Sequence, residues 1–406
     1  MIHIKRLYVG NCWEVGSILA VCRLYMSTFL DMSLVVLSDT AVARLEYVLS
    51  FGLFAIALVI FRFRANKRFV AFTCVLITYA LLNALLVTYK EYVAIELLGA
   101  MSASILPMYL FTLGVVDCDD LIKCWRGIAI IFTLMSPIFI LLYMRGFISY
   151  NDIGNYTHLN ILPLGYFLFT TPKDRIWHAI LVLINGAIGL VFGSRTLIAV
   201  SVLVVAVTAV VFVRKNWQYY FSLSFFVGLL ILAILRIEDF LMWVISFLEH
   251  YGLRSRNISL FLLHLRGGNF ESLSAGRSEI YSTVYAYVRQ RYGLPAGFGV
   301  TRFITNGEYY FSHNVFLDFA LVFGIWGSMV FFAWYSYRVY KFVIRTGSKT
   351  AEFAVFFLLA VPFWLRSVIG IYFLVHPFFY YSLALLLSNY SRSPQPEIGS
   401  TWLTKA

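Results

Sequence analysis

Runs of about 20 mostly apolar residues recur along the whole chain, and this feature constrains the fold more than any other. An apolar segment of that length crosses the hydrocarbon core of a bilayer as a helix, whereas membrane strands are shorter and alternate in polarity. Only 13% of the 406 residues are charged, compared with about 25% in a typical soluble domain. The sequence therefore predicts an all-α, polytopic membrane protein.

The apolar runs define about 12 expected transmembrane helices. They fall at residues 16–37, 44–61, 69–89, 92–115, 127–144, 158–172, 176–193, 196–213, 218–236, 312–337, 351–371 and 373–389. This division gives a bundle of nine spans over 1–236, a polar loop over 237–311, three further spans over 312–390 and a tail over 391–406. The N-terminus has no short apolar core followed by a small-residue cleavage site, so we expect the first span to be retained.

Lysine and arginine are concentrated in alternate short connections, which predicts the orientation of the spans. The basic connections are 1–15, 62–68, 116–126, 173–175, 214–217 and 338–350, while the other short ones hold chiefly Lys90 and Arg145. By the positive-inside rule, both termini are cytoplasmic and the loop over 237–311 is external. The net charge of +12 is thus explained by orientation and gives no indication of nucleic-acid binding.

The external loop is rich in arginine and contains no lysine. A guanidinium group binds phosphate through two parallel hydrogen bonds, whereas the lysine ammonium acts as a point charge. The loop therefore predicts a site for a phosphate-bearing substrate at the membrane surface. Apolar spacing also predicts a helix over about 237–248, lying in the membrane interface, and a second helix over about 276–291 with Ile280, Val284 and Val288 on one face.

Three external segments carry residues that could form one site. Arg195 lies in the tight turn between the seventh and eighth spans, and Arg277 begins the second predicted loop helix, where free N–H groups favour anions. His313 and Asn314 begin the tenth span. Each also has an ordinary alternative role: Arg195 could extend to the interface, Arg277 could form surface ion pairs, and His313 could be a helix-start residue.

Other polar residues are candidates for the same site. Arg366 lies within a span, where an ionised side chain is a functional hypothesis by default. Asp318 follows His313 by about one helical turn and could orient its imidazole or cap a neighbouring helix. Arg289 and Arg291 lie at the end of the second predicted loop helix, where solvation is their ordinary role.

Four motifs, in this order around one large loop, resemble the O-antigen polymerase and O-antigen ligase superfamily. They are Ser194-Arg195, Gly276-Arg277, Gly297-Phe298-Gly299, and Ser312-His313-Asn314 followed by Gly324-Ile325-Trp326-Gly327. The resemblance covers residues 190–330 approximately, and the rest of the chain matches only in having many spans. It implies a multi-pass protein of the bacterial inner membrane that transfers glycans from undecaprenyl diphosphate at the periplasmic face.

The resemblance also implies roles for individual residues. Arg195 and Arg277 would hold the diphosphate and His313 would lie near the attacking hydroxyl, so these three are the expected catalytic residues. We expect no metal, no cofactor and no nucleic acid, whereas the expected partners are an undecaprenyl-diphosphate-linked oligosaccharide, membrane lipid and a chain-length regulator protein. The expected substrate-binding residues are Arg366, Asn314, Arg289, Arg291 and Tyr281.

The acceptor distinguishes the two activities of this superfamily. A polymerase uses the sugar of another lipid-linked repeat unit, whereas a ligase uses lipid A-core. The stretch from His313 to Asp318 resembles the polymerases, so polymerase is the favoured function and ligase the alternative. A flippase for lipid-linked oligosaccharides is a third hypothesis, because about 12 spans also suit a transporter, although flippases generally lack such a long external loop.

Overall fold

The computed structural model describes residues 8–9, 13–33, 39–60, 67–114, 117–212, 237–250, 255, 258–259, 262, 266, 277–368 and 370–387. The regular secondary structure of this part of the chain is helical apart from β1 (Tyr8–Val9) and β2 (Trp13–Glu14), which pair antiparallel. The expected ninth span (218–236), most of the loop before residue 277 and the expected tail (391–406) lie outside the described residues.

The described helices overlap the other 11 expected apolar ranges, and the fourth range corresponds to α4, η1 and α5 together. Among the described residues, five segments are long and apolar enough to cross a membrane: 67–86, 90–109, 118–144, 172–192 and 315–346. The chain is therefore a helical membrane protein. The helices are α1 (Val15–Ser33), α2 (Asp39–Ile60), α3 (Lys67–Leu86), α4 (Lys90–Ala100), η1 (Met101–Ile105), α5 (Leu106–Gly114), α6 (Cys118–Met144), α7 (Tyr150–Thr170), η2 (Pro172–Asp174), α8 (Arg175–Phe192), α9 (Arg195–Phe212), α11 (Ile237–His250), α14 (Arg277–Gln290), α15 (Val300–Ile304), α16 (Val315–Thr346), α17 (Ala351–Ser367), η3 (Phe373–Val375) and α18 (Pro377–Leu387).

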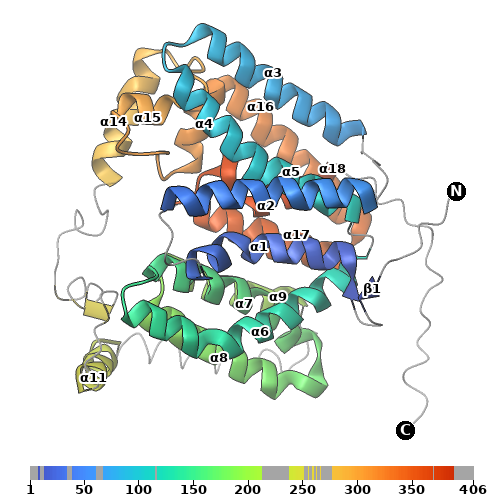
Figure 1. Cartoon of the computed structure of the whole chain (residues 1–406), viewed down its shortest axis with the longest axis vertical. Coiled ribbons are helices and arrows are strands. Elements are labelled where there is room, and N and C mark those ends of the chain that lie inside the picture. Colours follow the sequence, from blue (N-terminus) through green and yellow to red (C-terminus); the bar gives the residue numbers. More distant parts are fainter. Residues whose placement is uncertain are drawn as a thin grey trace, which may run out of the picture.

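The long helices lie side by side in three groups (Figure 1). Helices α6 to α9 pack together, α1 packs against α2, α5 and α6, and α18 packs against α5 and α17. The third group contains α3, α4 and α16, and the short helices α14 and α15 cover one end of it. Helix α11 lies at the same end of the molecule (left in Figure 1), so the described parts of the predicted external loop share one side.

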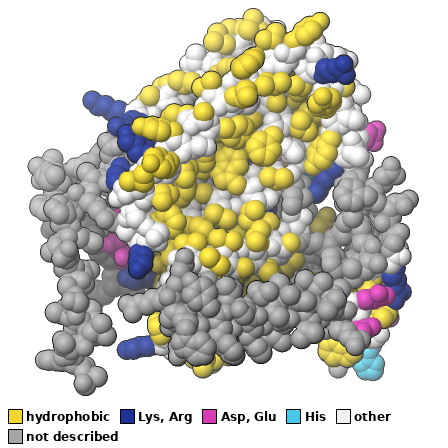
Figure 2. Space-filling view, turned by 180° about the vertical axis from the view of Figure 1, so that it is seen from behind, with side chains coloured by type: hydrophobic (Ala, Val, Ile, Leu, Met, Phe, Trp, Pro, Cys, Tyr) yellow, Lys and Arg dark blue, Asp and Glu magenta, His cyan; other side chains and the backbone are white. Residues whose placement is uncertain are grey.

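Hydrophobic side chains gather over the centre of the face shown in Figure 2, and lysine and arginine lie at the margins of this apolar area. The exposed apolar side chains of the described residues include Leu85, Leu134, Leu183 and Val330, each at least 70% accessible. An apolar surface of this extent is rare on soluble monomers, because contiguous apolar patches there seldom exceed a few hundred Å². This face therefore contacts lipid.

Helix α16 is interrupted at Gly324, where φ is 74° and ψ is 168°. In a regular helix the Ile325 N–H would donate to the Leu321 carbonyl, four residues earlier. Here the Ile325 N–H donates to the Gly293 carbonyl at 2.9 Å, and the Leu321 carbonyl accepts from the Ala296 N–H at 2.8 Å. The loop between α14 and α15 thus inserts its backbone into the broken helix.

The same loop is fixed from its other side by α3 and the residues that follow it. The Ala296 carbonyl accepts hydrogen bonds from Tyr89 Oη at 2.7 Å and from Asn83 Nδ2 at 3.2 Å. Any side chain at Gly297 would collide with Asn83, because a Cβ there would lie 1.8 Å from Asn83 Nδ2. The Gly297-Phe298-Gly299 and Gly324-Ile325-Trp326-Gly327 motifs therefore join the loop to two transmembrane segments. A Cβ at Gly327 would meet only Phe323 of its own helix, so no neighbouring helix among the described residues packs closely against this glycine.

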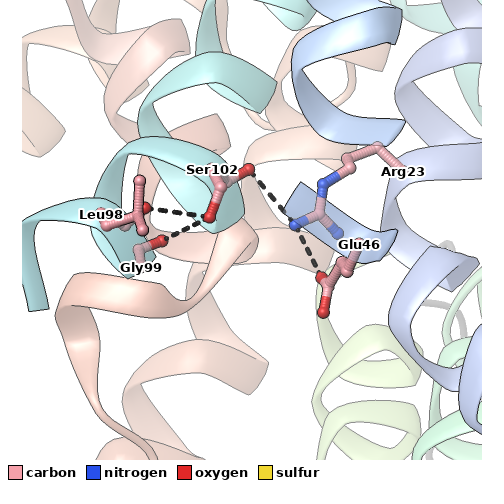
Figure 3. Close-up of polar contacts among 5 residues, drawn as sticks. All are labelled: Arg23, Glu46, Leu98, Gly99 and Ser102. Atoms are coloured by element: carbon pink, nitrogen blue, oxygen red, sulfur yellow. Dashed lines mark hydrogen bonds and ion pairs between the residues drawn. The ribbon is translucent and has the colours of Figure 1, made fainter. Parts of the chain in front are cut away.

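A buried ion pair joins α1, α2 and the π-helical turn η1 (Figure 3). Arg23 is 2% exposed, and its Nη2 donates to Glu46 Oε1 at 3.1 Å and to the Ser102 carbonyl at 3.5 Å. A π-helical turn disturbs the regular ladder of backbone hydrogen bonds, which makes a carbonyl such as that of Ser102 accessible to a side chain. A single buried guanidinium therefore holds three segments that are far apart in the sequence.

Candidate functional site

Arg277 and His313, predicted from two separate motifs, face the same point above Gly370. A Cβ placed on Gly370 would lie 3.5 Å from Arg277 Nη2 and 3.8 Å from His313 Nδ1, and no other atom of the described residues would lie within 4 Å. Gly370 follows α17, whereas Arg277 begins α14 and His313 precedes α16. Three elements distant in the sequence therefore meet here, and we call this place the Gly370 site.

The backbone around His313 is held in an unusual conformation by its neighbours. His313 has a φ of 60°, in the left-handed region, and its carbonyl accepts a hydrogen bond from Tyr281 Oη at 3.2 Å. Asp318 is 1% exposed, and its Oδ1 accepts from the Ser312 N–H at 2.8 Å. Asn314 Oδ1 caps α16 by accepting from the N–H groups of its first turn. The carboxylate of Asp318 thus positions His313 through the main chain, and no described bond joins it to the imidazole.

The structure corrects the start of the tenth span. Helix α16 begins at Val315, so His313 and Asn314 lie in the turn before the helix and not within an expected span over 312–337. The N-terminal cap formed by Asn314 explains this boundary, because its side chain satisfies N–H groups that have no partner inside the helix.

The environment of His313 keeps its imidazole neutral. Burial, together with the nearby positive charge of Arg277, lowers the pKa of His313 to about 4. Its Nδ1 is buried and has no hydrogen-bond partner among the described residues, and its ring lies 4.3 Å from that of Phe311, centroid to centroid. At neutral pH the imidazole is therefore able to accept or steer a proton.

Arg366 adjoins the same site through its own main chain. Its carbonyl accepts a hydrogen bond from the Gly370 N–H at 2.9 Å, and its Nη2 donates to Asn155 Oδ1 at 3.2 Å. Arg366 lies in the last turn of α17 and Asn155 in the second turn of α7. The ionised side chain within this expected span thus has an uncharged partner on a neighbouring helix.

The Ser194-Arg195 turn packs against α7 beside Asn155. A Cβ on Gly154 would lie 2.7 Å from the Ser194 N, so the two backbones are in direct contact. Arg195 is the first residue of α9, and its side chain lies outside the described part of the structure. The backbone therefore places Arg195 next to the helix that binds Arg366.

Arg289 and Arg291 are at the opposite end of α14 from Arg277. Arg289 follows Arg277 by 12 residues in one helix, which corresponds to roughly 18 Å along the axis. Both side chains are exposed, and Arg291 Nη2 donates to the Pro295 carbonyl at 3.2 Å. Of the expected substrate-binding residues, the structure places the backbones of Arg366 and Asn314 and the hydroxyl of Tyr281 beside Gly370 or His313, but not these two arginines.

Sequence reasoning missed Gly370 and Asn155. Gly370 stands at the end of an expected span, four residues after Arg366, which was the available signal. Asn155 lies near the start of α7, on the side that the arginine and lysine distribution predicts to be external. Neither residue type is informative in itself, because each gains its role from segments more than 50 residues away.

These features define a class: a multi-pass helical membrane protein with a basic and imidazole-containing site where several helices end. Comparison of the chain with known protein families, with curated proteins and with solved structures finds no match.

Proposed function

We propose that the chain is a surface-polysaccharide polymerase of the O-antigen type, with the Gly370 site as its active site. The observation that carries this proposal is that Arg277 Nη2 and His313 Nδ1 lie within 4 Å of one point. A lipid diphosphate leaving group requires cations placed in advance, and a sugar nucleophile requires a group that takes up its proton. One site supplies both.

In the proposed reaction, the hydroxyl oxygen of an acceptor sugar forms a bond to the anomeric carbon of the donor glycan. The bond between that carbon and the phosphate oxygen breaks, and its electron pair leaves with undecaprenyl diphosphate. Arg277, Arg195 and Arg366 stabilise the negative charge that develops on the diphosphate. The imidazole of His313 accepts the hydroxyl proton; its lowered pKa of about 4 keeps it unprotonated at pH 7, and also makes it a weaker base than a free histidine.

The proposal also places the site at the periplasmic face of the bacterial inner membrane, with about 12 spans and both termini in the cytoplasm. The contacts between the 193–194 turn and α7, between Arg366 and Asn155, and between Gly370 and Arg277 support this arrangement, because they join connections that the positive-inside rule assigns to one side. The proposed partners are the lipid-linked oligosaccharide and a chain-length regulator.

The test is complementation of a deletion strain, with the banding pattern of the surface polysaccharide as readout. Arg277→Lys and His313→Ala are expected to yield lipopolysaccharide with a single repeat unit. Arg145→Lys, at an exposed turn, is the matched control and should give the full ladder. Core without O-antigen, with polymer left on the carrier, would identify a ligase, and repeat units held on the cytoplasmic face would identify a flippase. Full ladders in both site variants would refute the proposed active site.

A further inference from the structure

Gly370 separates two nitrogen atoms that have no bonding partner among the described residues. His313 Nδ1 is buried without a hydrogen bond, and Arg277 makes no described hydrogen bond or ion pair. A buried donor or acceptor without a partner costs about 1–3 kcal/mol, so its persistence requires a reason. A ligand that forms hydrogen bonds with both side chains would provide that reason.

The separation of these nitrogens suits a phosphate group. Their distance from each other is at most roughly 7.3 Å, the sum of their distances from the Cβ position of Gly370. Charge-assisted hydrogen bonds to phosphate oxygens are about 2.8 Å long. Two such bonds to oxygens of one tetrahedral phosphate are compatible with this upper limit.

The Cβ of a side chain at position 370 would lie within 4 Å of both nitrogens. The Cβ of alanine would be in ordinary van der Waals contact with both, at 3.5 and 3.8 Å, so the protein could fold around it. The backbone of Gly370 is outside the left-handed region, so alanine is also compatible with its conformation. The glycine is therefore unnecessary for local backbone geometry, and its effect is to leave this space open.

We infer that Gly370 is a specificity-determining residue: its missing side chain leaves room for a phosphate of undecaprenyl diphosphate beside Arg277 Nη2 and the Nδ1–H of His313, so that the other ring nitrogen, Nε2, is the one that accepts the hydroxyl proton. This inference rests on the proposed function and names the part of the substrate that contacts both side chains. The donor phosphate lies against the Gly370 backbone, in the space that a side chain at residue 370 would narrow. Affinity for the carrier should therefore fall with the size of the side chain at this position.

The inference is tested by measuring the binding of undecaprenyl diphosphate to the purified full chain in detergent. Gly370→Ala is expected to weaken binding by about tenfold, the effect of losing one charge-assisted hydrogen bond, and Gly370→Val to weaken it further. Gly186→Ala and Gly186→Val are matched controls, because nothing lies within 4 Å of a Cβ on Gly186, and they should bind like the unmodified chain. Equal affinity in the Gly370 and Gly186 variants would overturn the inference.

A competition experiment distinguishes the carrier from other phosphate-bearing lipids. Vesicles of phosphatidylglycerol should compete poorly with undecaprenyl diphosphate, and equal competition would overturn the assignment of this space to the diphosphate carrier. Binding and polymer synthesis are separate readouts. Normal carrier binding by Gly370→Val would refute only the phosphate position beside Gly370, whereas a full ladder from Arg277→Lys and His313→Ala would refute the polymerase.

Discussion

Replacement of Gly324 by alanine tests whether the interruption of α16 anchors the external loop. The backbone at Gly324 is in a region that only glycine readily adopts, which costs other residues about 1–3 kcal/mol. A Cβ would also lie 2.9 Å from the Gly293 carbonyl and from Pro295. Moving this loop away would break the two backbone hydrogen bonds at Ile325 and Ala296, each worth about 1 kcal/mol. We therefore expect Gly324→Ala to lower the free energy of unfolding by about 3–5 kcal/mol.

The matched control is Gly327→Ala, three residues further along the same helix. Its Cβ would approach only Phe323 of the same helix, and alanine is intrinsically favoured over glycine in a helix by about 1 kcal/mol. Reversible unfolding with increasing SDS in mixed micelles measures both variants, and hydrogen exchange at the Ala296 and Ile325 amides reports the local effect. If Gly324→Ala unfolds with the same free energy as Gly327→Ala, the interruption does not hold the loop.

Three further predictions concern the site and the ion pair. The imidazole of His313 should remain neutral from pH 7 down to about pH 5 and become protonated near pH 4. In Arg277→Gln the pKa of His313 should rise, because the neighbouring positive charge is gone. Histidine NMR, with His313→Asn to assign the signal, measures this pKa, and an unchanged value in Arg277→Gln would show that Arg277 is distant. Asn155→Ala should shorten the polymer ladder by removing the acceptor of Arg366, whereas Asn155→Asp retains an acceptor, so identical ladders from both variants would contradict this role. Glu46→Leu should destabilise the protein by about 3 kcal/mol, because it leaves the buried charge of Arg23 unpaired. The double variant Arg23→Met/Glu46→Leu should lose much less stability, because it leaves no unpaired charge. Unfolding in SDS measures both variants, and an equal loss of stability would disprove the pairing.

Local periodicity predicted the loop helix accurately. The expected helix over about 276–291 is α14, Arg277–Gln290, and its apolar stripe of Ile280, Val284 and Val288 is buried. Such a stripe depends only on residues three or four positions apart, so it is visible in the sequence. The apolar ranges likewise correspond to helices wherever the structure describes them.

The assembly of the site depends on contacts that periodicity does not encode. The interruption of α16 at Gly324 arises because a loop about 30 residues earlier donates and accepts backbone hydrogen bonds there. The position of Gly370 between Arg277 and His313 likewise joins three elements whose side chains show no common pattern. The sequence could suggest Arg277 and His313 as separate candidates, but their shared contact point required the tertiary structure.

The ion pair between Arg23 and Glu46 has a consequence for biogenesis. Arg23 emerges from the ribosome 23 residues before Glu46 and 79 residues before Ser102. An arginine near the middle of a helix opposes its partition into lipid by about 2.5–3.5 kcal/mol. We therefore expect α1 to wait at the insertion machinery until α2 arrives, so that both enter the bilayer as one hairpin with the charge already neutralised.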